Sequence, residues 1–434
     1  MAKKYPSPIR GHYPFNEPNE PVKVYSGPLI IDNKVTENCS IEARWLPRQE
    51  IRWTTNISAE LSEILTLEEK DISFQSKDGH SVRARARIRT TNPLSGWIGK
   101  IETGNQNEPI RKLIAHWINA PNVIGSDPIS EHEPSRERTW RGRSRFSANG
   151  YLITMDARRD LSQKIRESKE NGGYFISHAM EISRENSEDF TTVDAQELLE
   201  SLRLAMSFAR GSWTSPCLPV GFNANNSIVW QSWSANHAEV YGRGVSWWDP
   251  HRSQDLTHFM ELYLKVFGNP SLWPTLRFLT QSSIASNTKG FLEQKIITAF
   301  SAIENLSWHT YVSSGKRSEQ NHKSRGQGKR VRELVNQLNL GLNIPENLVI
   351  LKNWAKKMEL GDAPMAITEI RNRLVHPKEP GEIYDTKGLL TEAWLLTTYY
   401  LELLILHWIG YQGSHGSRLI RGRWAGETDP VPWS

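Results

Sequence analysis

The chain has 434 residues, which at roughly 150 residues per domain predicts two or three domains. Its 53 Lys and Arg against 48 Asp and Glu give a formal net charge of +5, a surplus that permits contact with nucleic acid but does not by itself indicate it. Two cysteines exclude a disulfide framework and a zinc site built from paired cysteines. The opening segment MAKKYPSPIRGHYPF has no apolar run, so we expect no secretory signal and a cytoplasmic protein.

The first half of the chain has the pattern of β-strands. Short apolar and β-branched runs, separated by Pro, Gly, Asn or Asp, predict strands at 29–31, 39–45, 51–57, 82–89, 151–156, 174–182 and 227–233. Strict alternation in 82–89 places Arg83, Arg85, Arg87 and Arg89 on one face, which is either the solvent face of an edge strand or a grip for a phosphate backbone. One helix, at about 194–209, interrupts the strands.

From residue 249 onward the apolar period becomes that of α-helices. Asp249 followed by Pro250 predicts a helix start, and further amphipathic helices are predicted at 291–311, 331–338, 346–358, 365–375 and 386–409. The last of these is the most apolar stretch of the chain, yet it carries Glu402 near its middle. We therefore expect a helix buried in a bundle or at a dimer interface, and no membrane span.

These patterns predict an α+β protein in which a β-rich N-terminal region precedes an all-α helical bundle. The expected divisions are an N-terminal tail at 1–20, a β-rich domain at 21–248, connecting helices at 249–288, the bundle at 289–412 and a C-terminal tail at 413–434. Within the bundle, the polar segment from Ser313 to Arg330 is rich in Lys and Arg. It is either a disordered connector or a mobile basic arm that touches phosphates, with Lys329 and Arg330 as RNA contacts.

The most specific motif is AITEIRNRLVHP at 366–377, which places Arg371, Asn372 and His376 at the end of an amphipathic helix. At about 100° per residue these three side chains share one arc opposite the apolar stripe, and Pro377 turns His376 away from helical geometry. Similar spacings of Arg and His elsewhere lack the adjacent Asn and the flanking helices, namely Arg111–His116, Arg252–His258 and Arg317–His322.

This motif resembles the signature of the HEPN superfamily, whose small helical bundles include many metal-independent ribonucleases. The resemblance implies that Arg371 and His376 are catalytic and that Asn372 supports them, with Glu304 on the preceding long helix in the place of the acid that such bundles often carry. It further implies no cofactor, RNA as the substrate, and a homodimer whose two motifs face each other across one cleft. The residue types suit attack of a 2′-hydroxyl on the adjacent phosphorus, because His moves protons near neutral pH and Arg binds phosphate oxygens.

The β-rich half resembles the N-terminal part of bacterial antiphage proteins of the ApeA type. The segments that carry this resemblance are GYLITMDARRD, GYFISHAMEI, SFARGSWTSPCLPVGF and VWQSW. It implies that the first half senses a phage-derived trigger and that the bundle then destroys RNA in abortive infection.

Two alternatives remain open at this point. The chain could be a catalytically silent RNA-binding or scaffold protein, with the β-rich half as a ligand-sensing module. A metal could also be held by His251, Asp255 and His258, which fall on one face of the helix expected from Asp249.

Overall fold

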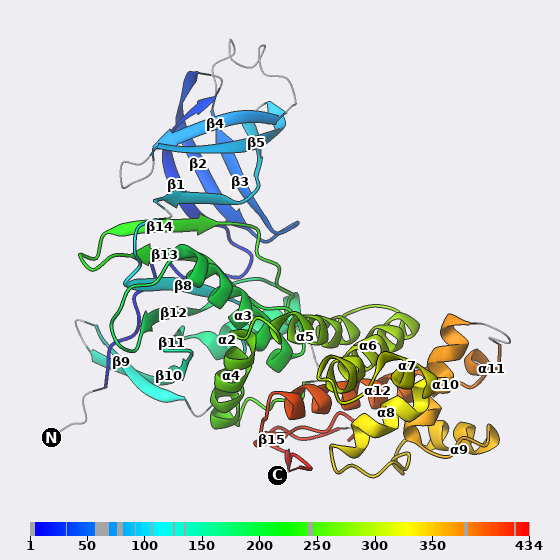
Figure 1. Cartoon of the computed structure of the whole chain (residues 1–434). Helices are drawn as coiled ribbons and strands as arrows, with labels where there is room; N and C mark the ends of the chain where they lie inside the picture. Colours follow the sequence, from blue (N-terminus) through cyan, green and yellow to red (C-terminus); the bar gives the residue numbers. More distant parts are fainter. Residues whose placement is uncertain are drawn as a thin grey trace. The chain divides into compact units, whose positions relative to one another are not determined.

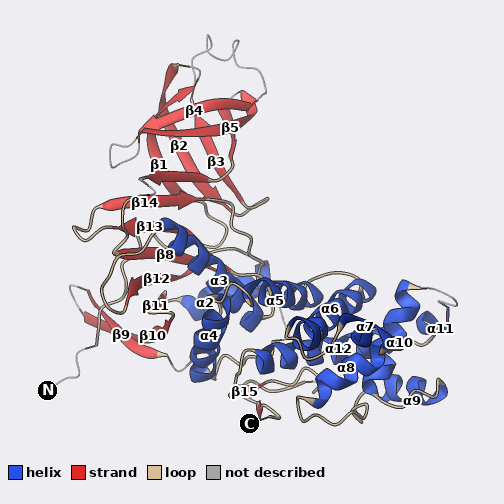
Figure 2. Ribbon diagram, viewed as in Figure 1, coloured by secondary structure: helices blue, strands red, loops and turns tan. Residues whose placement is uncertain are grey.

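The computed structural model describes residues 5–31, 33–56, 69–75, 81–91, 93–105, 107–124, 126–133, 136–241, 246–376, 381–420 and 422–433. The chain divides into two compact units. Unit 1 comprises Met1–Arg203 and Thr214–Gly242, and unit 2 comprises Leu204–Trp213 and Arg243–Ser434. The predicted α+β class is confirmed, because the strands of unit 1 precede a region that is almost entirely helical (Figure 2).

Unit 1 begins with a closed barrel of antiparallel strands in the order β1-β2-β3-β6-β5-β4 (Figure 1). The strands are β1 (Val22–Ile31), β2 (Lys34–Arg44), β3 (Glu50–Thr55), β4 (Glu69–Gln75), β5 (Ser81–Thr91) and β6 (Leu94–Ile98). Because β5 pairs with β4 and β6, the four arginines predicted on an edge strand lie on a strand with no free edge. Their exposure to solvent is as expected, and Arg85 and Arg87 both form ion pairs with Glu69.

The rest of unit 1 is an eight-stranded antiparallel sheet in the order β7-β14-β13-β8-β12-β11-β10-β9. Its strands are β7 (Ile101–Gly104), β8 (Lys112–Ile118), β9 (Asp127–Glu133), β10 (Arg136–Ala148), β11 (Tyr151–Ala157), β12 (Ile176–Arg184), β13 (Ser215–Phe222) and β14 (Ile228–Trp233). Two helices accompany it, α2 (Leu161–Asn171) and α3 (Thr192–Arg210), and the last turns of α3 group with unit 2.

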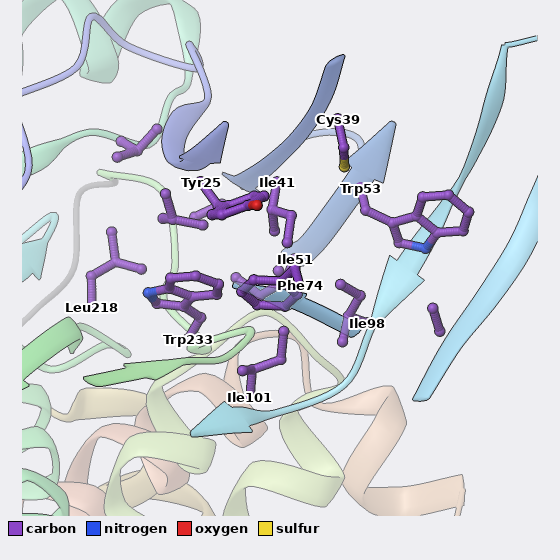
Figure 3. Packing of buried hydrophobic residues seen from close by; sticks show 14 of the residues in the cluster. Tyr25, Cys39, Ile41, Ile51, Trp53, Phe74, Ile98, Ile101, Leu218 and Trp233 are labelled. Carbon is purple, nitrogen blue, oxygen red and sulfur yellow. The ribbon is translucent and has the colours of Figure 1, made fainter. Parts of the chain in front are cut away.

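One apolar cluster joins the barrel interior to the sheet. Figure 3 shows Phe74 of β4 beside Trp233 of β14, and their rings stack with centroids 5.7 Å apart. The N-terminal segment packs in the same unit: Tyr13 and Asn16 are buried, and the backbone N–H of Ile9 donates to Asp156 at 2.7 Å. Part of the segment expected to be an N-terminal tail at 1–20 therefore packs within unit 1.

The helices of unit 2 surround α12, which packs against α5, α6, α8, α9, α10 and α11. The bounds are α4 (Ser253–Phe267), α5 (Trp273–Asn287), α6 (Leu292–Trp308) with a π-helical turn at His309–Ser313, α7 (Glu319–Ser324), α8 (Gln327–Asn336), α9 (Val349–Lys357), α10 (Ala363–Val375), α11 (Gly381–Asp385) and α12 (Leu389–Trp408). By length and composition α12 could cross a membrane, but 72% of its most apolar window is buried inside the structure, as in the core helix of a globular fold.

The structure adds detail at the margins of the bundle, and one expectation there was wrong. The first helix starts at Ser253, because the carboxylate of Asp249 accepts from the N–H groups of His251 and Gly426 and so closes a turn instead of capping a helix. Helix α5, which lies within the expected connecting helices at 249–288 but was given no bounds of its own, packs against α6 and α12, so this segment contributes to the helical core. The expected tail at 413–434 forms two short strands, β15 (Ser414–His415) and β16 (Asp429–Pro430), and places Arg418 in a buried ion pair with Glu402 of α12.

Candidate functional site

The candidate site lies where α6, α8 and α10 pack together, and its centre is the carboxylate of Glu304. Oε2 of Glu304 is 3.2 Å from Nη2 of Arg371 on α10, and Oε1 is 3.3 Å from Nη2 of Arg330 on α8. The three side chains are partly buried, with between 14% and 24% of their surface exposed. One carboxylate thus bridges two guanidinium groups, and we call these three residues the Glu304 cluster.

Local packing brings the helices of the cluster together. Gly328 in the first turn of α8 lies so close to α10 that an added Cβ would overlap the side chain of Met365. The carboxylate of Asp362 caps α10 by accepting from the N–H of Met365 at 2.9 Å, and it also accepts from Arg332 of α8 at 2.5 Å. A small residue at the contact and a cap shared with the neighbouring helix therefore fix α8 against α10.

The predicted motif is only partly assembled around Arg371. Nη1 of Arg371 donates to the side-chain oxygen of Asn372 at 3.1 Å, and its guanidinium lies 5.4 Å from the ring centroid of Phe300. His376 follows the last residue of α10, and its side chain is exposed. Within the described part of the chain, the imidazole of His376 has no hydrogen bond to the other motif residues. Pro377, expected to turn that imidazole outward, lies outside the described residues.

The Glu304 cluster keeps a surplus of positive charge and of donors. Two guanidinium groups face a single carboxylate, so one positive charge is not compensated within the cluster. The Nε–H groups of Arg330 and Arg371 are buried and have no hydrogen-bond partner among the described residues. Such unsatisfied donors are costly unless something accepts from them, and an oxyanion is the kind of group that arginine accommodates best.

The segment after α6 is ordered, and the expectation of a disordered connector is wrong. The side chain of Ser318 caps α7, and His322 in that short helix is buried edge-on against the ring of Trp308. Glu333 of α8 pairs with Arg317 at 2.9 Å and also with Arg325. The buried imidazole and these ion pairs hold the polar segment in place, so Arg330 belongs to a defined helix.

Sequence reasoning did not assign a role to His322, Arg317 or Glu333. The signal was present, because Arg317 and His322 have the same spacing as the motif, and their nitrogen atoms Nη1 and Nδ1 lie 3.4 Å apart. Burial and the neighbouring arginines lower the pKa of His322, so its neutral form is favoured. Of the two expected RNA contacts, Lys329 is exposed and Arg330 is engaged by Glu304.

The residues proposed for a metal have other partners. Nδ1 of His251 is 3.0 Å from Asp249, the carboxylate of Asp255 accepts from the backbone of Ser414 at 3.4 Å, and the ring of His258 packs against Tyr411. The described residues contain no group of three or more His, Cys, Asp or Glu side chains arranged to hold a metal ion.

Comparison with known proteins gives matches in both units. Residues 105–243, which contain β8 to β14, match the family model of the YopA central domain, and residues 273–430, from α5 to β16, match that of the YopA C-terminal domain. A relative in Bacillus subtilis (strain 168), the SPbeta prophage-derived uncharacterized protein YopA, is 24% identical over 434 residues, which covers 96% of this chain and 95% of the relative. No solved structure matches the chain significantly.

Proposed function

We propose that the helical unit is a metal-independent endoribonuclease of the HEPN type that acts in the cytoplasm. The observation that supports this best is the Glu304 cluster, in which Arg371 is positioned by Glu304 and Asn372, five residues before the exposed His376. Phosphodiester cleavage without metal requires a fixed cation and an accessible imidazole, and Arg371 and His376 supply one of each.

In the proposed reaction the 2′-hydroxyl oxygen of one nucleotide attacks the adjacent phosphorus. His376 accepts the hydroxyl proton, the bond from phosphorus to the 5′-oxygen breaks, and the leaving oxygen takes a proton from a protonated imidazole. The products are a 2′,3′-cyclic phosphate and a 5′-hydroxyl. Arg371 stabilises the charge that builds on the phosphoryl oxygens, and in a homodimer the second protomer supplies the second imidazole.

An exposed cation next to the cluster suits an RNA backbone. Lys329 is exposed on the first turn of α8, immediately before Arg330 of the cluster. A phosphate that reached the cluster would compete with the carboxylate of Glu304 for the two guanidinium groups. The prophage origin in the name of the Bacillus subtilis relative fits a role in conflict between phages and their hosts, in which unit 1 would sense a phage-derived trigger and unit 2 would act as an abortive-infection toxin.

A second function is favoured by one specific observation. Arg371 is engaged by Glu304 and Asn372, while the imidazole of His376 has no hydrogen bond to either of them in the described part of the chain. A site arranged in this way can bind phosphate without cleaving it, so the alternative is a silent RNA-binding or scaffold protein.

The experiment that separates these functions uses the full chain with total RNA in the presence of a chelator. His376→Ala and Arg371→Ala should each lower cleavage by about 10²-fold or more if these residues are catalytic. His132→Ala, which removes an exposed imidazole in unit 1, is the matched control. Growth arrest on expression should disappear with the same two variants. RNA that is bound but left intact, together with arrest that persists in the variants, would establish the silent binding protein instead.

A further inference from the structure

A cavity of about 890 Å³ lies in unit 1, which contributes no residue to the Glu304 cluster. One wall is the N-terminal segment at residues 7–15, and the others are strands β9 and β10 and the junction between β11 and α2. Small-molecule sites in proteins are typically about 300–1,000 Å³. The cavity is therefore large enough for a ligand of drug or nucleotide size.

The walls of this cavity are held in place before any ligand arrives. The N–H of Ile9 donates to Oδ2 of Asp156 at 2.7 Å, and Arg143 donates to the carbonyl oxygen of Ser7 at 2.9 Å. In the wall formed by β10, the indole N–H of Trp140 donates to the carbonyl oxygen of Ala157 at 3.0 Å. A preformed cavity loses little conformational entropy when it binds a ligand.

The carboxylates that line the cavity are all paired. Asp156 is 2.6 Å from Arg143, Asp160 is 2.6 Å from Arg158, and Glu131 is 4.0 Å from Arg159.

Arg10 is the lining arginine that takes part in none of these ion pairs. It is exposed in the lining, and it has no carboxylate partner among the described residues. Its guanidinium charge is therefore left without an ion-pair partner in the part of the chain that the structure describes. An arginine in this situation favours an anion with oxygen acceptors, such as a phosphate.

Two aromatic rings in the lining are available for stacking. Phe15 is 41% exposed, and the guanidinium of Arg158 lies 5.3 Å from its ring centroid. Trp140 is partly exposed, and its only polar group is already bonded to Ala157. Nucleic acid bases stack on aromatic side chains with little dependence on which base is present. A flat ring is therefore the apolar part of a ligand that this lining fits.

We propose that the cavity is a binding site for a free mononucleotide. Its base stacks against Trp140 or Phe15, and its phosphate pairs with Arg10. A base and a phosphate also occur at the end of a nucleic acid strand, so the test must separate a free nucleotide from a strand. The proposal stands independently of any ribonuclease activity of unit 2.

Isothermal titration calorimetry on the full chain tests this site with the four 5′-ribonucleoside monophosphates and their nucleosides as probes. At least one monophosphate should bind, and its nucleoside should bind about tenfold more weakly, because a charge-assisted pair with Arg10 is lost. Arg10→Ala should lower the affinity for the monophosphate to that for the nucleoside. Phe15→Ala should lower the affinity for both ligands. Arg166→Ala removes another exposed arginine, on α2 and outside the cavity, and should change nothing.

Two results would overturn the proposal. The first is the absence of heat with every monophosphate, or affinities that are the same in Arg10→Ala and the wild-type chain. The second is binding of a 5′-phosphorylated tetraribonucleotide that Arg10→Ala weakens, while no monophosphate binds. The site would then bind the end of a nucleic acid strand and not a free mononucleotide. Circular dichroism of each variant checks that the fold is retained.

Discussion

Arg371 and Glu304 are 67 residues apart in sequence, and their side chains meet at 3.2 Å where α10 packs on α6. The second oxygen of the same carboxylate holds Arg330 at 3.3 Å. Glu304 therefore both positions the guanidinium groups and neutralises part of their charge. These two effects have opposite consequences for RNA, because positioning supports catalysis while neutralisation weakens the attraction for phosphate.

Glu304→Gln separates the two effects, since it keeps the shape of the side chain and removes its charge. We expect the free energy of unfolding to fall by about 1 kcal/mol, a modest loss because the ion pairs are partly exposed. The salt dependence of binding to single-stranded RNA should become steeper by about 0.7 in log–log slope, as one more phosphate is neutralised. Urea unfolding and fluorescence anisotropy at several salt concentrations measure these quantities.

The control for this experiment is Glu319→Gln, which removes an exposed carboxylate of α7 paired with Lys323. It should leave the stability nearly unchanged. A Glu304→Gln variant that matched this control in both stability and salt slope would contradict the role given to the carboxylate.

Both cysteines should be inert in the folded chain. Cys39 of β2 and Cys217 of β13 are buried, and burial raises the pKa of the Cys39 thiol to about 12 and that of Cys217 above its ordinary value. Since the thiolate is the reactive form, we expect no labelling by a thiol reagent at pH 8 in native buffer and labelling of both in denaturant. Rapid labelling of either thiol in the native chain would show that its strand opens readily.

Most of the helices that the sequence predicts have a clear apolar stripe, and α5 shows why the bounds of a helix without one could not be predicted. Its buried positions include Thr280, Ser282, Ser283 and Ser286, so its buried face does not stand out from its exposed face in the sequence. Strands β8 and β13 are buried along almost their whole length and therefore show no alternation of apolar and polar residues. The apolar periodicity of a sequence reveals an element that is buried on one face. These elements are buried on more than one face, so their periodicity is weak.

The sequence likewise predicted some residues of the candidate site and not the contact that Arg330 makes in it. Arg371, Asn372 and Glu304 were found through a family motif and its expected neighbouring helix. The contact of Arg330 with Glu304 depends on α7 and α8 being ordered, and that order comes from the burial of His322 beside Trp308. A polar segment that is fixed by one buried histidine has no period from which its structure could be predicted.

Acid should destabilise unit 1 through His116. This residue of β8 is fully buried, and burial lowers its pKa to about 4, while in the unfolded chain the pKa is about 6.5. Between these values the unfolded chain binds a proton that the folded chain does not. Stability is therefore lost as the pH falls from about 6.5 to about 4, by about 1.4 kcal/mol per pH unit at most.

His116→Gln should reduce that slope, although the substitution itself lowers stability at neutral pH. Urea unfolding of the full chain at pH 7.5, 6 and 5 gives the slope for each variant. His132→Gln, at an exposed position of β9, should keep the slope of the wild type. Equal slopes for His116→Gln and the wild type would mean that the buried imidazole is protonated without unfolding.

The C-terminal segment should contribute strongly to the stability of unit 2 through Arg418. Its side chain is fully buried, and it donates through Nε to Oε2 of Glu402 in α12 at 2.8 Å and through Nη2 to the other carboxylate oxygen. Arg418→Met leaves the carboxylate of Glu402 buried without its partner, and this should cost about 3–5 kcal/mol. Lys265→Met, on the exposed surface of α4, is the control and should have little effect.

The double variant Arg418→Met with Glu402→Leu removes both charges and replaces them with apolar side chains. It should recover most of the stability lost in the single variant, because the desolvation of two ions disappears together with their attraction. Urea unfolding of the single variants, the double variant and the wild type completes the cycle and gives the coupling free energy. A single variant as stable as the wild type would mean that water reaches Glu402, and that the C-terminal segment is not held against α12 in solution.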